Sequence, residues 1–525
     1  MIESSIGKTD LLIVAGYLIF IIWWGLKHGK SKDSQSYFLA GRSTSWKVIG
    51  FSMFAASIST TTLIGQSGDA YHTGIAVFNY NLVGVVVMVL FAFFLLPLYI
   101  RSKIYTIPEF LERRFDKKSR YYFSAICIFG NIFLDAAGAL YAASLIIKII
   151  FPEVDIQLIT LFFGIVVACY VIPGGLSSVI NAELIQAIVL IIGSAFLSYF
   201  CFQKGSSYFY DLLASDDILV KLIRPIDDTA TPWLGLIVGM PILSIYYWGN
   251  NQTLVQRVLS AKSIDEGRRG VILSGFLMLS TLFIIILPGL IARYIFPDLE
   301  TADTVYPTML LKLMPIGLVG ILLAAIISAL LSALSAIVNS TSTLFTMDFY
   351  AQWNKNADSK KLVNVGKITA IIIIIIAALW APQIGQFGSL LKYYQEMLSY
   401  LCPPIVATFV MGIFSKRVNA KGAFFGLIGG LLLAILTFLF KKELFGDMHF
   451  LLIVPILFLS SILIIYLVSL TVPAPPKEQL ENTTFNQQFM KTEIQALKQI
   501  RWYKNYQIWS FLLLVSCVLL WIIFY

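Results

Sequence analysis

The stretch Ala55-Ala-Ser-Ile-Ser-Thr-Thr-Thr-Leu-Ile-Gly-Gln-Ser-Gly-Asp69 decides how this chain folds. It lies at the end of an apolar block, yet five Ser and Thr residues occur within positions 57–62, followed by Gly65 and Gly68. Such hydroxyl side chains compete for backbone hydrogen bonds and favour a local break in a helix. We therefore expect an interrupted helix at membrane depth, where non-helical backbone is tolerated if it lines a cavity or is packed in protein.

A second interruption is expected at Ser244-Ile-Tyr-Tyr-Trp-Gly-Asn-Asn-Gln252, where polar amides follow an aromatic cluster. The two segments lie five predicted spans apart. That spacing is typical of inverted repeats, in which half-helix ends and free carbonyls meet near the middle of the membrane. For either segment alone, the alternative is that small and hydroxyl side chains pack between continuous helices.

The composition of the whole chain indicates a membrane protein. Of 525 residues, 58% are hydrophobic and 13% are charged, whereas soluble proteins are about one quarter charged. The apolar residues form blocks of about twenty, the length that crosses a ~30 Å hydrocarbon core. We predict an all-α polytopic membrane protein with about 14 transmembrane helices, at residues 10–27, 45–69, 76–100, 120–151, 155–172, 181–203, 232–255, 270–297, 309–350, 362–381, 388–414, 421–440, 449–472 and 508–525.

The basic residues predict the orientation of these spans. The connections at 27–48, 101–120, 256–269, 351–361, 415–421 and 473–507 hold 27 of the 38 Lys and Arg residues. Because cytoplasmic loops carry the excess of positive charge, both termini are expected outside. The net charge of +9 thus comes from short loops and does not indicate nucleic-acid binding. Residues 494–502 have helical apolar spacing, which fits either a helix on the inner membrane surface or a plain tether.

The residue types exclude several other classes of protein. The five cysteines lie inside apolar runs without paired spacing, so we expect neither disulfides nor a metal cluster. There is no glycine-rich phosphate loop followed by lysine, so transport is expected to use a gradient and not ATP. We expect no enzyme activity and no cofactor. The connection from Tyr105 to Arg120 is interpreted as an amphipathic connector whose charges are solvated.

Four further stretches are distinctive: Tyr105-Thr-Ile-Pro-Glu-Phe-Leu-Glu-Arg-Arg-Phe115, Pro173-Gly-Gly-Leu-Ser-Ser-Val179, Tyr246-Tyr-Trp-Gly-Asn-Asn-Gln252 and Asn339-Ser-Thr-Ser-Thr-Leu-Phe-Thr-Met-Asp348. With them the chain resembles the solute:sodium symporter family, in the branch of the bacterial sodium/galactose symporter and the mammalian sodium/glucose cotransporters. The resemblance runs from about residue 35 to 470. It implies a LeuT-type five-plus-five inverted repeat with additional flanking helices, divided here as 1–40, 41–220, 221–415 and 416–525.

The resemblance also implies a sodium site between the first broken helix and the ninth span. Its ligands would be the backbone carbonyls of Ala55, Ile58 and Ala329 and the hydroxyl of Ser332. The second serine usual in the family is Ala333 here, so one ligand is missing. The usual aspartate on the sixth span is Glu183, which would either contribute to the sodium region, titrate, or pair structurally with a base.

For the solute, the resemblance implies a site that contains Gln395 and Tyr247, which match the sugar-contacting glutamine and the aromatic gate. Thr62, Asn81, Ser244 and Met278 stand where the galactose symporter has Gln, Glu, Asn and Lys. Most of these changes keep hydrogen-bonding capacity but alter its geometry, and buried polar groups penalise a solute that leaves them unpaired. The solute is therefore expected to be sugar-like, with its identity left open.

Asp135 interrupts the apolar fourth span. A carboxylate at the middle of a membrane costs a few kcal/mol, so it should face the interior or a cavity. It would bind solute hydroxyls, attract an amine, carry a proton, or be satisfied by Asn131 or a neighbouring helix. The sequence thus predicts sodium-coupled symport of a neutral sugar or polyol across a bacterial inner membrane. The alternative is a proton-coupled or uncoupled carrier of a sugar-like or amine-bearing solute. The oligomeric state is left open.

Overall fold

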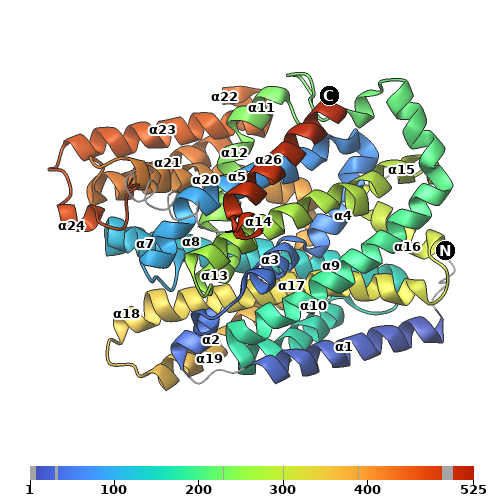
Figure 1. The fold of residues 1–525 in the computed structure, drawn as a ribbon, viewed down its shortest axis with the longest axis horizontal. Helices are drawn as coiled ribbons and strands as arrows, with labels where there is room; N and C mark the ends of the chain where they lie inside the picture. The colour runs from blue at the N-terminus through green and yellow to red at the C-terminus, as the bar shows by residue number, and fades with distance from the viewer. Residues whose placement is uncertain (1–6, 30–32, 229, 300, 388–389, 487–500) are drawn as a thin grey trace.

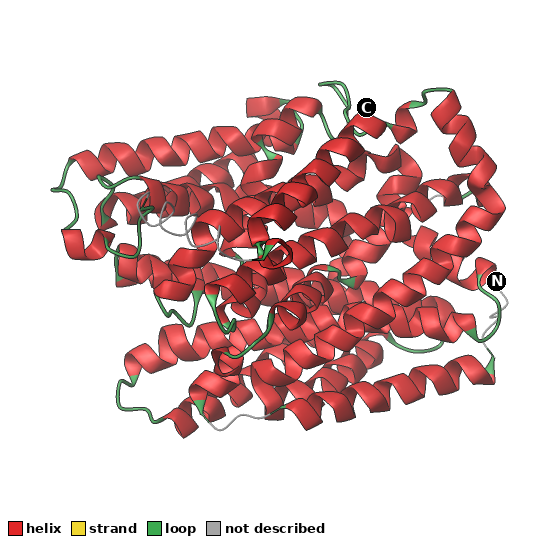
Figure 2. Cartoon of the chain, in the orientation of Figure 1, coloured by secondary structure: helices red, strands yellow, loops and turns green. Residues whose placement is uncertain are grey.

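The computed structural model describes residues 7–29, 33–228, 230–299, 301–387, 390–486 and 501–525, and within these it contains helices and no β-strand (Figure 2). Eleven helices of the described residues are long and apolar enough to cross a membrane. Two of them are much longer than the roughly 20 residues that one crossing needs: α10 (Ile156–Ala214) has 59 residues, and the stretch Thr60–Arg101 has 42. The expectation of an all-α membrane protein is confirmed, while the total of fourteen crossings stays a prediction.

The first broken helix and the helices that follow it form one group of elements. The bend inside α10 occurs at Gly175, whose φ of 56° is a conformation that glycine adopts without strain. The elements of this group are α2 (Ser34–Leu39), α3 (Trp46–Ser57), α4 (Thr60–Thr73), α5 (Asn79–Leu90), η3 (Phe91–Leu95), α6 (Leu96–Arg101), α7 (Ile107–Arg114), α8 (Lys117–Gly130), η4 (Asn131–Ala136), α9 (Ala137–Ile150) and α10.

A second group begins with the other broken helix. Its longest member, α17 (Leu318–Leu344), is buried along nearly all of its length. The remaining elements are α11 (Trp233–Val238), α12 (Met240–Ile245), η6 (Tyr246–Asn250), α13 (Gln252–Leu259), α14 (Ile264–Thr281), η7 (Leu282–Ile286), α15 (Leu287–Ile295), η8 (Ala302–Thr304), α16 (Val305–Leu313), η9 (Phe345–Tyr350), α18 (Ala351–Trp353), α19 (Ser359–Trp380), η10 (Ala381–Phe387) and α20 (Leu390–Phe414).

Further helices flank these two groups, and Figure 1 shows α1 along the lower edge and α21 to α24 at the upper left, while the red α26 crosses the middle of the view. The first helix, α1 (Lys8–His28), packs against α10 and α17, and the last, α26 (Tyr506–Ile523), packs against α14 and α5. The others are α21 (Ala420–Leu439), α22 (Lys441–Phe445), α23 (Phe450–Leu470) and α24 (Lys477–Leu480). α17 of the second group contacts α10 and α3 of the first group, and it is buried along nearly all of its length.

Some expected boundaries are corrected by the structure. Gly65 and Gly68 do not break the chain but lie inside α4. Gly68 instead permits close packing, since a Cβ there would lie 2.4 Å from the carbonyl oxygen of Ala302. The span expected at 309–350 is divided, with α16 ending at Leu313 and α17 beginning at Leu318. Most of the stretch 494–502, expected to be helical, lies outside the described residues.

Candidate functional site

The first helix break lies at Ile58 and Ser59, between α3 and α4. Ile58 has φ −99° and ψ 90°, which ends the helix, and Ser59 then caps α4 by accepting a hydrogen bond from the amide of Thr62 at 3.2 Å. The last carbonyls of a helix have no partner within it. The break therefore frees the carbonyl oxygens of α3 for other ligands at a fully buried position.

One of these carbonyls is joined to α17 through Ser332. The Ser332 hydroxyl lies 2.9 Å from the carbonyl oxygen of Ala55 and 3.1 Å from that of Ala329. All three residues and Ile58 are almost completely buried. Of the expected sodium residues, Ala55, Ala329 and Ser332 are thus brought together as a cluster of neutral oxygens from two helices, while a contribution of the Ile58 carbonyl stays a prediction. Oxygen ligands of this kind suit a hard cation, and the neighbouring Ala333 adds no hydroxyl.

Glu183, also expected in the sodium region, lies on α10 and forms a buried ion pair. Its carboxylate lies 2.5 Å from Nη2 of Arg257 and 3.3 Å from Nε, and it also accepts a hydrogen bond from Ser52 on α3. The Glu183 and Arg257 side chains are completely buried. Glu183 thus holds α3 one turn before Ala55 and also holds α13, and its role in sodium binding stays a prediction.

The second break faces the first. The π-helical turn η6 ends at Asn251, which has an extended ψ of 117°, and its side chain caps α13 by accepting from the amide of Thr253 at 2.8 Å. Tyr247, in η6, donates its hydroxyl to the carbonyl of Ser57 at 3.3 Å. Thr62 donates to the same carbonyl at 3.4 Å. The end of α3 is therefore bonded both to α4 and to the second broken helix.

A cavity of about 170 Å³ lies between the two breaks. The six residues expected to bind solute all line it: Thr62, Asn81, Asp135, Ser244, Tyr247 and Gln395. They come from α4, α5, η4, α12, η6 and α20. Several helices that are distant in the sequence therefore contribute polar groups to one enclosed space, as expected for a small-molecule site.

Sequence reasoning missed Gln66, which lines this cavity as the partner of Asn81. Gln66 and Asn81 donate to each other's side-chain oxygens at 3.2 Å in both directions. Asn81 also donates to the hydroxyl of Thr281 on α14 at 2.8 Å. The signal for Gln66 was available, because it lies four residues after Thr62 and so shares a helix face with it.

The described residues that line the cavity are almost all neutral. Among the described lining residues, Asp135 is the one carboxylate, and there is no lysine or arginine. Met278 occupies a lining position and accepts a weak hydrogen bond from the Ser57 hydroxyl at 3.4 Å. Asn131, considered above as a partner for Asp135, donates instead to Thr341 at 2.9 Å.

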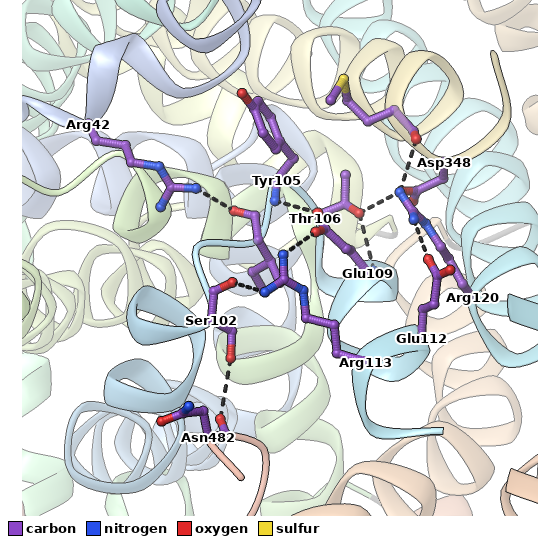
Figure 3. Close-up of polar contacts among 12 residues, drawn as sticks. Arg42, Ser102, Tyr105, Thr106, Glu109, Glu112, Arg113, Arg120, Asp348 and Asn482 are labelled. Carbon is purple, nitrogen blue, oxygen red and sulfur yellow. Dashed lines mark hydrogen bonds and ion pairs between the residues drawn. The ribbon is translucent and has the colours of Figure 1, made fainter. Parts of the chain in front are cut away.

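A second polar cluster lies around Asp348, away from the cavity (Figure 3). One carboxylate oxygen of Asp348 accepts from Thr106 at 2.6 Å and from Nη2 of Arg120 at 2.6 Å. The other accepts from Ser124 at 2.6 Å. Arg120 also pairs with Glu112. These bonds tie the connection around α7 to the end of the α17 segment on the side of the molecule that carries most of the basic loops.

The expectation that the charges of the 105–120 connection are solvated is wrong for two arginines. The Arg120 side chain is 5% exposed, and Arg114 is completely buried. Arg114 donates to the carbonyls of Gly412, Ser415 and Val418 at 2.7–3.0 Å. Burial lowers the pKa of its guanidinium to about 10, which leaves it charged at neutral pH and able to cap the end of α20.

Comparison with known proteins agrees with this geometry. The model of the sodium:solute symporter family matches residues 37–430. The chain belongs to the sodium:solute symporter family. The human sodium/myo-inositol cotransporter is 33% identical over 547 aligned positions, which cover 92% of this chain and 76% of that protein. The sodium/glucose cotransporter of Vibrio parahaemolyticus is 33% identical over 467 positions, covering 83% of this chain and 86% of that protein.

The fold is confirmed by a solved structure of a Na⁺-coupled sialic acid symporter in a substrate-bound, outward-open state. It aligns with a TM-score of 0.80 and 23% identity, covering 89% of this chain and 99% of that one. The chain is therefore a multi-pass, sodium-coupled solute symporter of LeuT-type fold, and sodium is its coupling ion. It is a transporter and not an enzyme, as the sequence predicted.

Proposed function

We propose that this symporter carries a neutral sugar or polyol together with sodium. The observation that carries the proposal is the lining of the central cavity, where neutral amide and hydroxyl side chains converge from several helices. Vicinal hydroxyls of a polyol both donate and accept, so they match amides such as Asn81 and Gln395. Two relatives support the proposal, because their names state that they carry myo-inositol and glucose with sodium.

Within the cavity we assign solute binding to Thr62, Asn81, Asp135, Ser244, Tyr247 and Gln395. A carboxylate can accept two hydroxyl donors, which makes Asp135 a candidate for the strongest polar contact. The same carboxylate also favours a second candidate, an amine-bearing solute such as an amino sugar. The absence of basic residues from the described lining argues against an anionic solute.

For sodium we assign the carbonyls of Ala55, Ile58 and Ala329 and the hydroxyl of Ser332. The Ser332 hydroxyl donates to the Ala55 carbonyl. When a cation enters, both oxygens would turn toward it, which draws α3 and α17 together. Glu183 would act from beside this site, because it accepts a hydrogen bond from Ser52 and so fixes α3, the helix that carries Ala55.

The two proposed sites meet at Ser57. Its carbonyl accepts from Tyr247 and Thr62 on the solute side, while Ala55, two residues earlier, faces α17. A cation that orders the end of α3 therefore also fixes the position of Tyr247. Each ligand then favours the same conformation more strongly when the other is bound, which is the thermodynamic requirement for coupling.

We further propose a plasma-membrane location with the N-terminus outside, supported by the 27 basic residues on one set of connections. The repeats are proposed to be 41–220 and 221–415, with flanking parts at 1–40 and 416–525. Each proposed repeat begins at a broken helix, α3–α4 in the first and α11–α13 in the second.

The test is uptake by purified protein in proteoliposomes, with labelled myo-inositol, glucose and glucosamine supplied separately. An inward sodium gradient is compared with an equal potassium gradient. We expect concentrative uptake of myo-inositol or glucose in sodium only. Preferential uptake of glucosamine would favour the amine-bearing candidate, and uptake of none of the three would reject the proposed class of solute.

A further inference from the structure

The last helix, α26, is bonded to the start of α5 through Trp521. The indole Nε1 of Trp521 donates to Oδ1 of Asn79 at 3.0 Å. The amide of Asn79 donates in turn to the carbonyl of Leu222 at 2.6 Å, and the backbone N–H of Leu222 donates to the carbonyl of Phe524 at 2.7 Å. The hydrogen bonds thus run from α26 through α5 and the 218–228 connection and return to the residue after α26.

The position of Asn79 makes this ring relevant to solute binding. Asn79 is completely buried and is the first residue of α5. The next two residues, Tyr80 and Asn81, both line the central cavity. Asn81 is the residue that bonds to Gln66 and Thr281. Because neighbouring residues on one helix turn rotate together, the bond to Asn79 sets the direction in which Asn81 enters the cavity.

The rest of α26 follows α14 and the α5 segment, as Figure 1 shows for the red helix. At the other end, the guanidinium of Arg268 on α14 lies 4.5 Å from the ring centroid of Tyr506 and donates to the carbonyl of Ala92 at 2.8 Å. Between the ends, Leu513 packs so closely on Gly275 that a Cβ there would lie 2.6 Å from its Cδ2. α26 therefore packs against both α14 and α5.

We propose that Trp521 is a positioning residue for the solute site, although it does not line the cavity. Its indole N–H fixes the rotation of the first turn of α5 through Asn79, and so holds the Asn81 amide in place for the solute. This role rests on the established sodium-coupled symport and holds for whichever small solute the cavity accepts.

The first test needs no solute. We would compare Trp521→Phe with wild type by hydrogen–deuterium exchange of the full-length protein in lipid nanodiscs. The matched control is Trp509→Phe on the same helix, whose indole donates to the carbonyl of Tyr503 and does not bond to α5. We expect amides at 79–84 to exchange about three- to ten-fold faster in Trp521→Phe, with no change in α17. Equal exchange in both variants would overturn the proposal.

The second test separates positioning from general damage. In proteoliposomes with a sodium gradient, Trp521→Phe is expected to raise the KM for myo-inositol or glucose about three- to ten-fold while kcat stays within about two-fold. Trp509→Phe should change neither. A fall in kcat at unchanged KM would contradict positioning. If wild type accumulates neither sugar, the proposed solute class fails, and the exchange comparison alone decides the role of Trp521.

A double-mutant cycle addresses the partner. Asn79→Ala removes the acceptor of the Trp521 hydrogen bond. If the two residues act through this bond, amide exchange at 79–84 in the double variant should be no faster than in the more strongly affected single variant. If one variant folds poorly, the other still reports on the same bond. Fully additive effects would show that the two residues act separately and would reject the proposed link.

Discussion

The proposed sodium site can be tested by moving one hydroxyl group between neighbouring positions. Ser332→Ala removes a hydroxyl that lies 2.9 Å from the Ala55 carbonyl and 3.1 Å from that of Ala329. Ala333→Ser adds a hydroxyl at the adjacent buried position, which lines the central cavity and so has space for it. The first change should weaken sodium binding, and the second should strengthen it.

The magnitude follows from comparing the sodium-bound and sodium-free states. With sodium bound, loss of the Ser332 oxygen removes an interaction with a charge, about 1.5–3 kcal/mol. Without sodium, the same change removes a neutral hydrogen bond to Ala55, about 0.5–1.5 kcal/mol. The bound state loses more, by about 1–1.5 kcal/mol, which corresponds to a roughly 5- to 12-fold higher sodium half-saturation. For Ala333→Ser we expect a gain of about 1 kcal/mol, or roughly five-fold tighter binding.

The assay is the sodium dependence of initial uptake in proteoliposomes, with ionic strength held constant by potassium. Ser342→Ala is the matched control, because Ser342 is a buried serine of the same helix that donates only to the carbonyl of Asn339. The double variant Ser332→Ala/Ala333→Ser should return close to the wild-type half-saturation. If both single variants match the control, the cation is not bound between α3 and α17 and the reasoning fails.

Three other predictions follow from the described contacts. Tyr247→Phe removes the hydrogen bond to the Ser57 carbonyl, which contributes about 1 kcal/mol. Efflux of solute from loaded proteoliposomes without sodium should therefore rise about five-fold, and unchanged efflux would show that Tyr247 has no part in coupling. Asp348→Asn leaves the buried Arg120 with Glu112 as its remaining carboxylate partner, so the cost should stay below the about 3–5 kcal/mol of a fully unpaired buried charge. The melting temperature in detergent should fall by several degrees, and an unchanged value would show that the Arg120–Asp348 pair does not stabilise the fold. Gln395→Ala should raise the KM for the solute about ten-fold without altering sodium binding measured in its absence, and a shift in sodium binding alone would contradict its assignment.

The sequence was sufficient for the helices and for both breaks, because each leaves a local signal. Apolar blocks set the spans, and the hydroxyl run at 57–62 predicted a break that the structure places at Ile58 and Ser59. The glycines were misjudged because a small residue that permits close packing has the same local signature as one that breaks a helix. Gly68 belongs to the first kind, and its partner Ala302 is more than two hundred residues away.

The polar networks could not be predicted from the sequence, because their partners are also far apart along the chain. A basic residue in a connection between spans is usually solvated, and Arg114 and Arg120 become buried because their acceptors come from α20 and the end of the α17 segment. The sequence left three interpretations of Glu183 open: a contribution to the sodium region, titration, or structural pairing with a base. The position of Arg257, 74 residues later in the chain, is what places its carboxylate in an ion pair.

The flanking helices constrain how sodium and solute can influence each other. Near its N-terminus, α1 holds α17 through Asp10, whose carboxylate accepts from the amides of Gly317 and Gly320 at 2.9 and 2.7 Å. At the other side, α26 holds α5 and α14. The helix with the proposed sodium residues and the helices with Asn81 and Met278 therefore each have their own support. We propose that the signal between them passes through the broken helix, where the Ala55 carbonyl faces α17 and the Ser57 carbonyl faces Tyr247. Because these two carbonyls are only two residues apart, we expect that reorienting one disturbs the other, which would make the break the coupling element.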